Sequence, residues 1–366
     1  MTEIIPPTRG EPAPSFILPS ASNPRYSFDT AAGRYLVLCF FHSAADARTM
    51  ARVKAALARP DLFNDSHASF FGLSSDPADQ EQGRIANRIP GYRILWDHDL
   101  TASRLYGAVS PAGQRLGVWA ITDPRMRLLD VIPFRADAGD IAQVIDRIAS
   151  LPPAETFAGQ PLMAPILFLP DVFEPDLCRH LIGLYEAQGG EESGVMREIG
   201  GRTIGVNDRS HKSRKDITLS DQALIGGIQS RFLRRIVPEI RKAHQFEVTR
   251  MERYIVSCYA AEEGGHFAPH RDNTTSGTAH RRFAVSINLN DDFDGGEVGF
   301  PEYGTRRFKA PPGGAVVFSC SLLHSVSKVT AGRRYAFLPF LYDDAAARIR
   351  DANRHKLGTP AEAADK

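Results

Sequence analysis

A proline-rich segment at residues 152–165, PPAETFAGQPLMAP, divides this 366-residue chain into two parts of different pattern. Short apolar runs alternate with helical stretches before it, whereas two helical stretches and then many short β-rich runs follow it. Its four prolines and weak periodicity are typical of a linker. The length suits two ordinary domains, so we expect each part to fold around its own core.

The first part predicts an α/β domain over residues 8–150. Residues 35–41, YLVLCFF, form a continuous apolar run, which suits a strand buried on both faces of a largely parallel sheet. We expect further strands at 69–73 and 118–122, and helices at 45–57, 77–88 and 140–151. Asp140 is expected to cap the last helix.

The second part predicts an α+β domain over residues 166–345, after a linker at 151–165. We expect helices at 175–188 and 221–244, the latter kinked at Pro238. Strands are expected at 254–259, 282–289, 315–319 and 335–341. Helices followed by many antiparallel strands favour a jelly roll, that is, a double-stranded β-helix, with its core at 250–343. The tail, 346–366, is expected to form a short helix at most and then disorder.

Charge and cysteine content narrow the setting of the protein. The chain has 44 basic and 43 acidic residues, and this balance gives no general attraction to nucleic acid or anionic membrane. We find neither a signal peptide nor an apolar stretch of roughly 20 residues that could span a bilayer. The cysteines lie far apart, which favours buried thiols in a reducing compartment: Cys39, Cys178, Cys258 and Cys320. We therefore expect a cytoplasmic protein.

A candidate metal site begins with His270 and Asp272. Two residues apart on a strand, their side chains point to the same face, so an imidazole and a carboxylate can hold one ion together. His324 follows a late apolar strand that a jelly roll returns to the side of the early one. Either histidine alone fits a hydrogen-bonded core residue. Together the three match the facial triad of Fe(II) oxygenases, which leaves metal positions open.

Arg334 supplies the second part of the candidate site. It lies ten residues beyond His324 on the next apolar strand, GRRYAFLPFLY. A buried guanidinium is costly unless it binds an anion, and its planar fork matches a carboxylate. The triad and this arginine together predict a dicarboxylate cofactor beside the metal. Arg333, its neighbour, is expected to face outward.

Three segments carry a resemblance to a known family: RYIVSCYAAEEGGHFAPHRDN, RRFAVSINLNDDFDGGEVGFPEYG and PPGGAVVFSCSLLHSVSKVTAGRRYAF. They resemble the catalytic domain of the prolyl 4-hydroxylase class of 2-oxoglutarate/Fe(II) dioxygenases, strongly over 250–343 and loosely over 165–250. The resemblance implies that His270, Asp272 and His324 bind iron and that Arg334 binds the distal carboxylate of 2-oxoglutarate. Tyr259 matches a tyrosine that lines the cofactor site. Asn288 stands where relatives often carry a second tyrosine.

The resemblance also implies a reaction. Fe(II), 2-oxoglutarate and O2 would hydroxylate a C–H bond with release of succinate and CO2, with ascorbate as an auxiliary. Asp272 favours hydroxylation, since related halogenases lack this carboxylate. A protein or peptide side chain is the expected substrate, with proline the first guess by analogy. Hydroxylation of a small-molecule metabolite and a non-catalytic redox or oxygen sensor remain alternatives.

The first part carries a second resemblance, in GEPAPSFILPS, GRYLVLCFFHSAADARTM, FFGLSSDP, ILWDHDLTASRLYGAVSP and VWAITDP. These segments resemble the peroxiredoxin/alkyl hydroperoxide reductase (AhpC/TSA-like) branch of the thioredoxin fold. Peroxidase chemistry there needs a low-pKa cysteine where the helix after the first core strand begins. The chain has HSAADARTM there, and Cys39 lies too early, inside the strand. We expect the fold without the peroxidase, in docking, dimerisation or substrate presentation, or as a stabilising appendage.

Residues 197–216, REIGGRTIGVNDRSHKSRKD, are basic and poor in apolar residues. Such a composition is typical of a solvated loop. A sharper hypothesis is a mobile lid over the iron site, because related enzymes close loops over their substrates.

Overall fold

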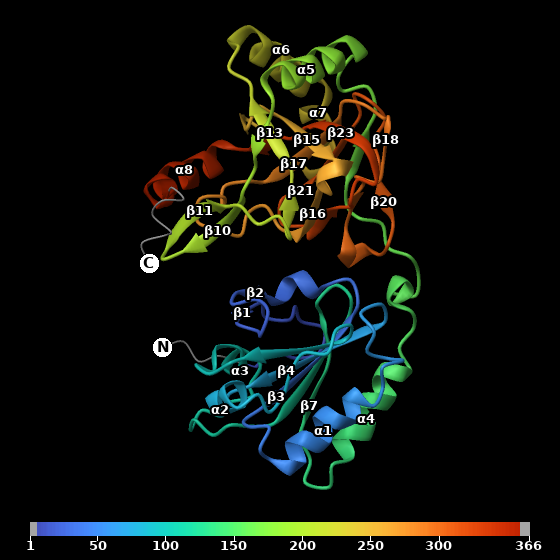
Figure 1. The fold of residues 1–366 in the computed structure, drawn as a ribbon, viewed down its shortest axis with the longest axis vertical. Coiled ribbons are helices and arrows are strands. Elements are labelled where there is room, and N and C mark those ends of the chain that lie inside the picture. Colours follow the sequence, from blue (N-terminus) through green and yellow to red (C-terminus); the bar gives the residue numbers. More distant parts are fainter. Residues whose placement is uncertain (1–5, 359–366) are drawn as a thin grey trace. The chain divides into compact units, whose positions relative to one another are not determined.

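The computed structural model describes residues 6–358. Its contacts divide the chain into two compact units (Figure 1). The first comprises Met1–Met163 with the short segment Pro301–Thr305, and the second comprises Ala164–Phe300 and Arg306–Lys366. The first division, after Met163, falls inside the segment that the sequence assigns to the linker.

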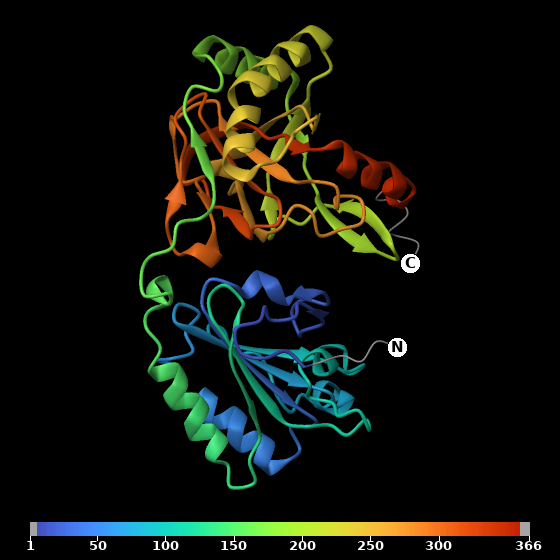
Figure 2. The same cartoon turned by 180° about the vertical axis from the view of Figure 1, so that it is seen from behind.

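A five-stranded sheet forms the centre of the first unit. Its order is β5-β4-β3-β6-β7, in which β3 runs parallel to β4 and β4 parallel to β5, while β6 is antiparallel to β3 and to β7. Helices α1 (Ala47–Leu57) and α4 (Gly139–Ala149) pack together on one side of this sheet (Figure 2). This topology confirms the expected thioredoxin-like fold. The strands are β3 (Tyr35–Phe41), β4 (Ala68–Ser74), β5 (Tyr92–Trp96), β6 (Val118–Thr122) and β7 (Leu128–Pro133).

The core of this unit follows from its apolar strands, since every residue of β3, β4 and β6 is buried. Two local predictions were wrong. Helix α2 (Pro77–Glu81) ends before residue 88, because Gly83 takes a positive φ of 60°. Asp140 does not cap α4, which begins after Ala138; its carboxylate is fully buried and accepts hydrogen bonds from Arg52 and from the indole N–H of Trp119.

Two antiparallel sheets form the second unit. The larger has the order β14-β24-β17-β23-β15-β13-β9, with β21 beside β17 and β8 beside β21; the smaller has the order β12-β16-β22-β19-β20. This is the predicted jelly roll (Figure 1). The strands of the larger sheet are β8 (Leu167–Leu169), β9 (Glu191–Glu192), β13 (Lys215–Thr218), β14 (Arg250–Glu252), β15 (Ile255–Ala260), β17 (Phe283–Asn288), β18 (Phe293–Asp294), β21 (Ala315–Ser319), β23 (Ala331–Phe337) and β24 (Phe340–Tyr342). Strand β18 pairs with β23. The smaller sheet contains β12 (Lys212–Ser213), β16 (His266–His270), β19 (Val298–Gly299), β20 (Arg307–Phe308) and β22 (His324–Val326).

Helices pack against the larger sheet and complete the core. They are α5 (Pro175–Gln188), α6 (Gln222–Arg235) and α7 (Val237–His244). Leu181, Ile228 and Phe232 from these helices join Val256 and Phe337 from the sheet in one buried cluster. The predicted kink at Pro238 is a complete break: α6 ends at Arg235, and Pro238 lies in the first turn of α7, where its missing N–H costs nothing.

The end of the chain forms a longer helix than expected, α8 (Asp344–Asn353), followed by a 3-10 turn at Arg354–Lys356. The predicted disorder falls partly on residues 359–366, which lie outside the described part. Among the described helices, none has both the length and the apolar character needed to cross a membrane.

Candidate active site

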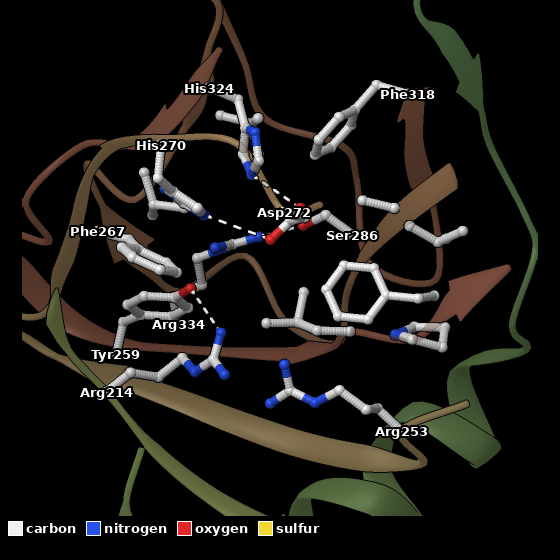
Figure 3. A pocket seen from close by; sticks show the side chains of 17 residues that line it. Arg214, Arg253, Tyr259, Phe267, His270, Asp272, Ser286, Phe318, His324 and Arg334 are labelled. Carbon is white, nitrogen blue, oxygen red and sulfur yellow. Dashed lines mark hydrogen bonds and ion pairs between the residues drawn. The ribbon is translucent and has the colours of Figure 1, made fainter. Parts of the chain in front are cut away.

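A cavity lies between the two sheets of the second unit (Figure 3). Tyr259 on β15, Ser286 on β17 and Arg334 on β23 line it from the larger sheet, and His270 and His324 line it from the smaller one. It encloses about 510 Å³ of empty space, part of it open to solvent. The remaining lining is largely apolar, including Phe267, Val285, Val298, Phe318, Val326 and Phe340.

The predicted metal ligands meet in this cavity. His270 on β16 lies directly opposite His324 on the neighbouring antiparallel strand β22. Asp272 places one carboxylate oxygen 3.6 Å from Nε2 of His270 and the other 3.3 Å from Nε2 of His324. One potential ligand atom from each of the three residues lies within 4.8 Å of the others. The structure therefore brings together the three residues that the sequence selected.

One part of the sequence argument for this group was wrong. Strand β16 ends at His270, so Asp272 does not share a face of that strand with it. The carboxylate reaches the site from the following turn, which the backbone N–H of Asp272 fixes by donating to the carbonyl oxygen of Cys320 at 3.0 Å.

Hydrogen bonds orient both histidines for metal binding. Nδ1 of His270 lies 2.8 Å from the carbonyl oxygen of Ala268, and Nδ1 of His324 lies 3.0 Å from that of Leu322. A carbonyl only accepts, so each Nδ1 carries a proton, and Nε2 is the ring nitrogen left to bind a metal. Phe267 stacks on the His270 ring, with centroids 3.5 Å apart, and limits its rotation.

The protonation states also suit a divalent cation. Burial, with repulsion from His270, lowers the pKa of His324 to about 4, so its ring is neutral at pH 7. Burial alone would raise the pKa of Asp272, but the neighbouring His324 and His270 outweigh it and hold that pKa well below its usual range. Neutral imidazoles and an ionised carboxylate are the forms that ligate metals, and two His with one carboxylate fit Fe(II).

Arg334 is a buried cation with one unsatisfied nitrogen. It is 1% exposed, and it donates from Nε to Asn288 Oδ1 at 2.9 Å and from Nη2 to Ser286 Oγ at 2.7 Å. Its Nη1 has no hydrogen-bond partner within residues 6–358. An unpaired buried donor on a charged group is costly, which indicates a site for an anion. A carboxylate of 2-oxoglutarate fits this donor and this charge.

Glycine at position 296 makes room for this arginine. Gly296 has a φ of +68°, and a Cβ there would lie 2.9 Å from Cδ of Arg334. A larger residue would therefore be strained in its backbone and would crowd the guanidinium's stem.

The other two predicted cofactor residues have different places. Tyr259 lies directly opposite Arg334 on the adjacent strand and lines the cavity, with the guanidinium carbon 5.2 Å from its ring centroid. Asn288 does not line the cavity; it accepts from Arg334 and donates from Nδ2 to the carbonyl oxygen of Ala310 at 2.7 Å. Both polar atoms of the amide are engaged, so Asn288 positions Arg334 instead of contacting a cofactor.

Sequence reasoning missed several cavity residues. Ser286, which holds Arg334, has no signal in the sequence beyond its place on an apolar strand. Arg253 could not be placed from the sequence. Its positive φ of 64°, between β14 and β15, interrupts the alternation of side chains along a strand that predicts which residues face the cavity. Arg214 lies in the basic stretch 197–216 and could have been weighed as a site residue there.

The basic stretch 197–216 does not form one continuous solvated loop or lid. Strands β10 (Val195–Ile199) and β11 (Arg202–Val206) form a hairpin. Farther on, β12 pairs with β16 and β13 with β15, so this part belongs to both sheets of the jelly roll. The side chains of Lys212, Ser213 and Arg214 are buried. Lys212 and Arg214 were misread because their charges face the interior, whereas Arg202 and Arg209 in the same stretch are exposed.

Comparisons with known proteins agree with this geometry. Residues 254–342 match the sequence profile of the 2OG-Fe(II) oxygenase superfamily, where 2OG is 2-oxoglutarate. The second unit contains a 2OG-Fe(II) oxygenase domain. A PKHD-type hydroxylase of Pseudomonas fluorescens is 38% identical over 91 residues, which make up 22% of this chain and 39% of the relative. The chain thus spans well under half of that relative's length.

Solved structures similar to this chain fall into two groups. The first group includes a prolyl hydroxylase of Trichoplax adhaerens in complex with a peptide fragment of hypoxia inducible factor. Its sequence identity is 14% and its TM-score is 0.40. The similarity covers 58% of this chain and 96% of that one. The second group includes the bacterioferritin comigratory protein of Xanthomonas campestris, with 15% identity and a TM-score of 0.31, covering 37% and 90%. The sheet orders given above, not these scores, define the two folds.

The thioredoxin-like unit lacks the thiol that peroxidase chemistry needs. Helix α1 begins at Ala47 after the cap Asp46, and residues 42–50 contain no cysteine. Cys39 is fully buried in β3, and burial raises the pKa of its thiol well above the usual value. A protonated, inaccessible thiol does not attack peroxide.

Proposed function

We propose that the second unit is an Fe(II)- and 2-oxoglutarate-dependent dioxygenase that hydroxylates a protein or peptide side chain and releases succinate and CO2. The observation that carries this proposal is the unsatisfied Nη1 of buried Arg334 in the cavity that also holds His270, Asp272 and His324. A metal triad and a carboxylate receptor in one cavity suit a chelating keto acid. The match to a PKHD-type hydroxylase supports hydroxylation as the outcome.

The residues of this chain have separable tasks in such a reaction. His270 and His324, with their Nδ1 protons held by backbone carbonyls, would present Nε2 to iron, and Asp272 would supply the third ligand. Bound iron and 2-oxoglutarate would together activate O2 for insertion of oxygen into a C–H bond. Arg334 would bind the distal carboxylate, and Asn288 and Ser286 fix the direction of its guanidinium.

The apolar lining has a role as well. Phe267, Phe318 and Val326 line the cavity together with the triad. Such walls keep bulk water away from the reacting atoms and strengthen the attraction between Arg334 and a carboxylate.

Succinate formation tests the proposal. Purified protein with Fe(II), ascorbate, 2-oxoglutarate and O2 is expected to form succinate and CO2, and a panel of proline-containing peptides to raise the rate. Asp272→Ala is expected to abolish succinate formation, because it removes the ligand from the turn after β16. Asp176→Ala, at an exposed position on α5, is the matched control and should retain full activity. Succinate formed equally by wild type and Asp272→Ala would overturn the proposal.

We propose docking or dimerisation, not redox catalysis, as the role of the first unit. The absence of a cysteine at the start of α1 and the burial of Cys39 support the exclusion of thiol redox catalysis. Analytical ultracentrifugation and peptide hydroxylation by the full chain and by a chain beginning at Ala164 test it. Unchanged association state and unchanged KM for peptide would contradict it.

A further inference from the structure

A second cationic group lines the cavity and is not used by the iron or 2-oxoglutarate assignments. Arg214 precedes β13, and Arg253 lies between β14 and β15. Figure 3 shows their guanidinium groups turned toward each other from opposite sides of the cavity. Asp216 links them, since its Oδ2 lies 2.7 Å from Nη2 of Arg214 and 3.5 Å from Nη2 of Arg253.

This cluster, Arg214–Asp216–Arg253, carries more positive than negative charge. One carboxylate faces two guanidiniums, and Asp216 is closer to Arg214 and also accepts from Ser257 Oγ at 2.7 Å. Repulsion from Arg214 and Arg281 adds to burial in lowering the pKa of Arg253. The positive charge of Arg253 is therefore only weakly balanced by Asp216. One more negative charge would neutralise the cluster.

Unsatisfied donors point to the same conclusion. The side chain of Arg214 is 4% exposed, and its Nε has no hydrogen-bond partner in the described part of the chain, although Nη1 and Nη2 donate to Tyr259, Ser193 and Asp216. Arg334 is a separate receptor with its own unsatisfied Nη1. The two unsatisfied nitrogens belong to different arginines, so one carboxylate of 2-oxoglutarate at Arg334 leaves the cluster's surplus charge in place.

The direction of the Arg253 side chain depends on an unfavourable backbone conformation. A φ of +64° is uncommon for a residue with a long side chain, because it strains the backbone. This conformation turns the guanidinium into the cavity, where it lies 5.6 Å from the Phe340 ring centroid. The side chain keeps 31% exposure, so a molecule entering from solvent can reach it.

We propose that the cluster is a receptor for a carboxylate of the substrate, so that the enzyme acts on a substrate that carries an acidic group close to the oxidised carbon. The surplus of a single positive charge matches one carboxylate, and guanidinium groups bind carboxylates with charge-assisted hydrogen bonds. The carboxylate belongs either to an acidic residue of a polypeptide or to a free acid. This inference rests on the proposed function of the same cavity.

Acetate binding tests the receptor without knowledge of the substrate. Protein is loaded with Mn(II), which does not turn over, and saturated with 2-oxoglutarate. Broadening of the acetate methyl NMR signal by Mn(II) then reports acetate in the cavity, and acetamide is the neutral isostere. We expect saturable broadening by acetate and none by acetamide. Arg253→Gln is expected to weaken acetate binding about tenfold, the loss typical of one charge-assisted contact.

Two further variants keep this result interpretable. Arg253→Lys keeps the charge and should retain part of the affinity. Arg250→Gln, three residues earlier, removes an exposed arginine that pairs with Asp344 and should bind acetate like wild type. Equal broadening by acetate and acetamide, or equal acetate affinity in wild type and Arg253→Gln, would overturn the receptor.

Two arms assign the source of the carboxylate. A short proline peptide with a neighbouring Glu is compared with its Gln form, and N-acetylproline with its amide. The rate of succinate formation is measured with each compound. If the charged form raises this rate more in the peptide pair, the carboxylate belongs to an acidic residue of a polypeptide. If it raises the rate more in the N-acetylproline pair, the carboxylate belongs to a free acid. Failure of Mn(II) to enhance water-proton relaxation in the wild type would overturn the proposed function and the receptor together. Normal Mn(II) and 2-oxoglutarate binding without an acetate site would overturn the receptor alone.

Discussion

Arg334 lies directly opposite Tyr259 on neighbouring antiparallel strands, and Tyr259 accepts a hydrogen bond at 3.3 Å from a second buried arginine, Arg214. One tyrosine thus stands between a guanidinium assigned to the cofactor and another assigned to the substrate. The pairing of β15 with β23 sets this arrangement, so the strand register determines which cation faces which part of the cavity.

Arg334→Gln tests the cofactor receptor. The variant is expected to bind 2-oxoglutarate about 100-fold more weakly, because losing one partner of a buried charge pair costs several kcal/mol. Metal binding should be unchanged, since the triad lies on other residues. Calorimetric titration of 2-oxoglutarate into Mn(II)-loaded protein measures the effect.

Its control is the neighbouring residue. Arg333→Gln removes an exposed guanidinium that pairs with Glu262 on the other face of β23. It should bind 2-oxoglutarate like wild type, and equal losses in the two variants would contradict a specific role for Arg334.

Two substitutions of Asn288 test separately how Arg334 is positioned and how its charge binds 2-oxoglutarate. Asn288→Ala leaves Nε of Arg334 and the carbonyl of Ala310 without their partner, so we expect about 1–3 kcal/mol lower stability and a higher KM for 2-oxoglutarate. Asn288→Asp should pair with Arg334 and neutralise it, so the KM for 2-oxoglutarate should rise further while the pair offsets part of the stability loss. Urea unfolding and succinate assays measure both quantities. A KM in Asn288→Asp equal to that of wild type would exclude this positioning role.

Lys212 gives the stability a defined pH dependence. Burial, with repulsion from Arg214, lowers its pKa from 10.5 to about 6. The unfolded chain therefore binds one more proton than the folded chain between these values, so stability should rise with pH across this window and be lost as pH falls toward 6. The slope is at most about 1.4 kcal/mol per pH unit.

Substitution isolates this contribution. Lys212→Met should flatten the dependence of the unfolding free energy on pH between 6.5 and 9, as measured by urea unfolding. Lys242→Met, at a position that is 71% exposed, should run parallel to wild type. Parallel curves for Lys212→Met and wild type would show that the buried amine keeps an ordinary pKa.

The thiols of the chain should be inert in the native state. All four cysteines are buried, and burial raises the pKa of each. We expect no rapid alkylation by iodoacetamide and no thiol-dependent peroxide turnover before unfolding, with four alkylated sites afterwards. Mass spectrometry measures the sites, and rapid labelling of Cys39 in folded protein would revive a peroxidase reading.

Much of this site follows from sequence patterns, because ligand identity and strand alternation are local properties. His270, His324 and Arg334 lie on strands whose apolar neighbours mark them, and the pairing of β16 with β22 brings the histidines together as expected. The fold classes follow equally well, since buried strands such as β3 are continuous apolar runs.

The remaining features depend on geometry that no local pattern encodes. Asp272 reaches the metal site from a turn, and Arg253 enters the cavity through a positive φ. Asn288 acts through the side chain of Arg334, 46 residues away in sequence. Lys212 and Arg214 in the basic stretch 197–216 appeared solvated from the sequence, because the polar partners that they bind come together only in the folded sheets.

The most direct test of the central claim is the spectrum formed by anaerobic protein with Fe(II) and 2-oxoglutarate. A weak metal-to-ligand charge-transfer band arises only where the keto acid chelates the iron. The band therefore requires that the metal held by the triad and the keto acid held by Arg334 meet in the same cavity. Wild type and Arg333→Gln should show this band, and Asp272→Ala should not. Binding of Fe(II) and of 2-oxoglutarate without the band in wild type would contradict the account.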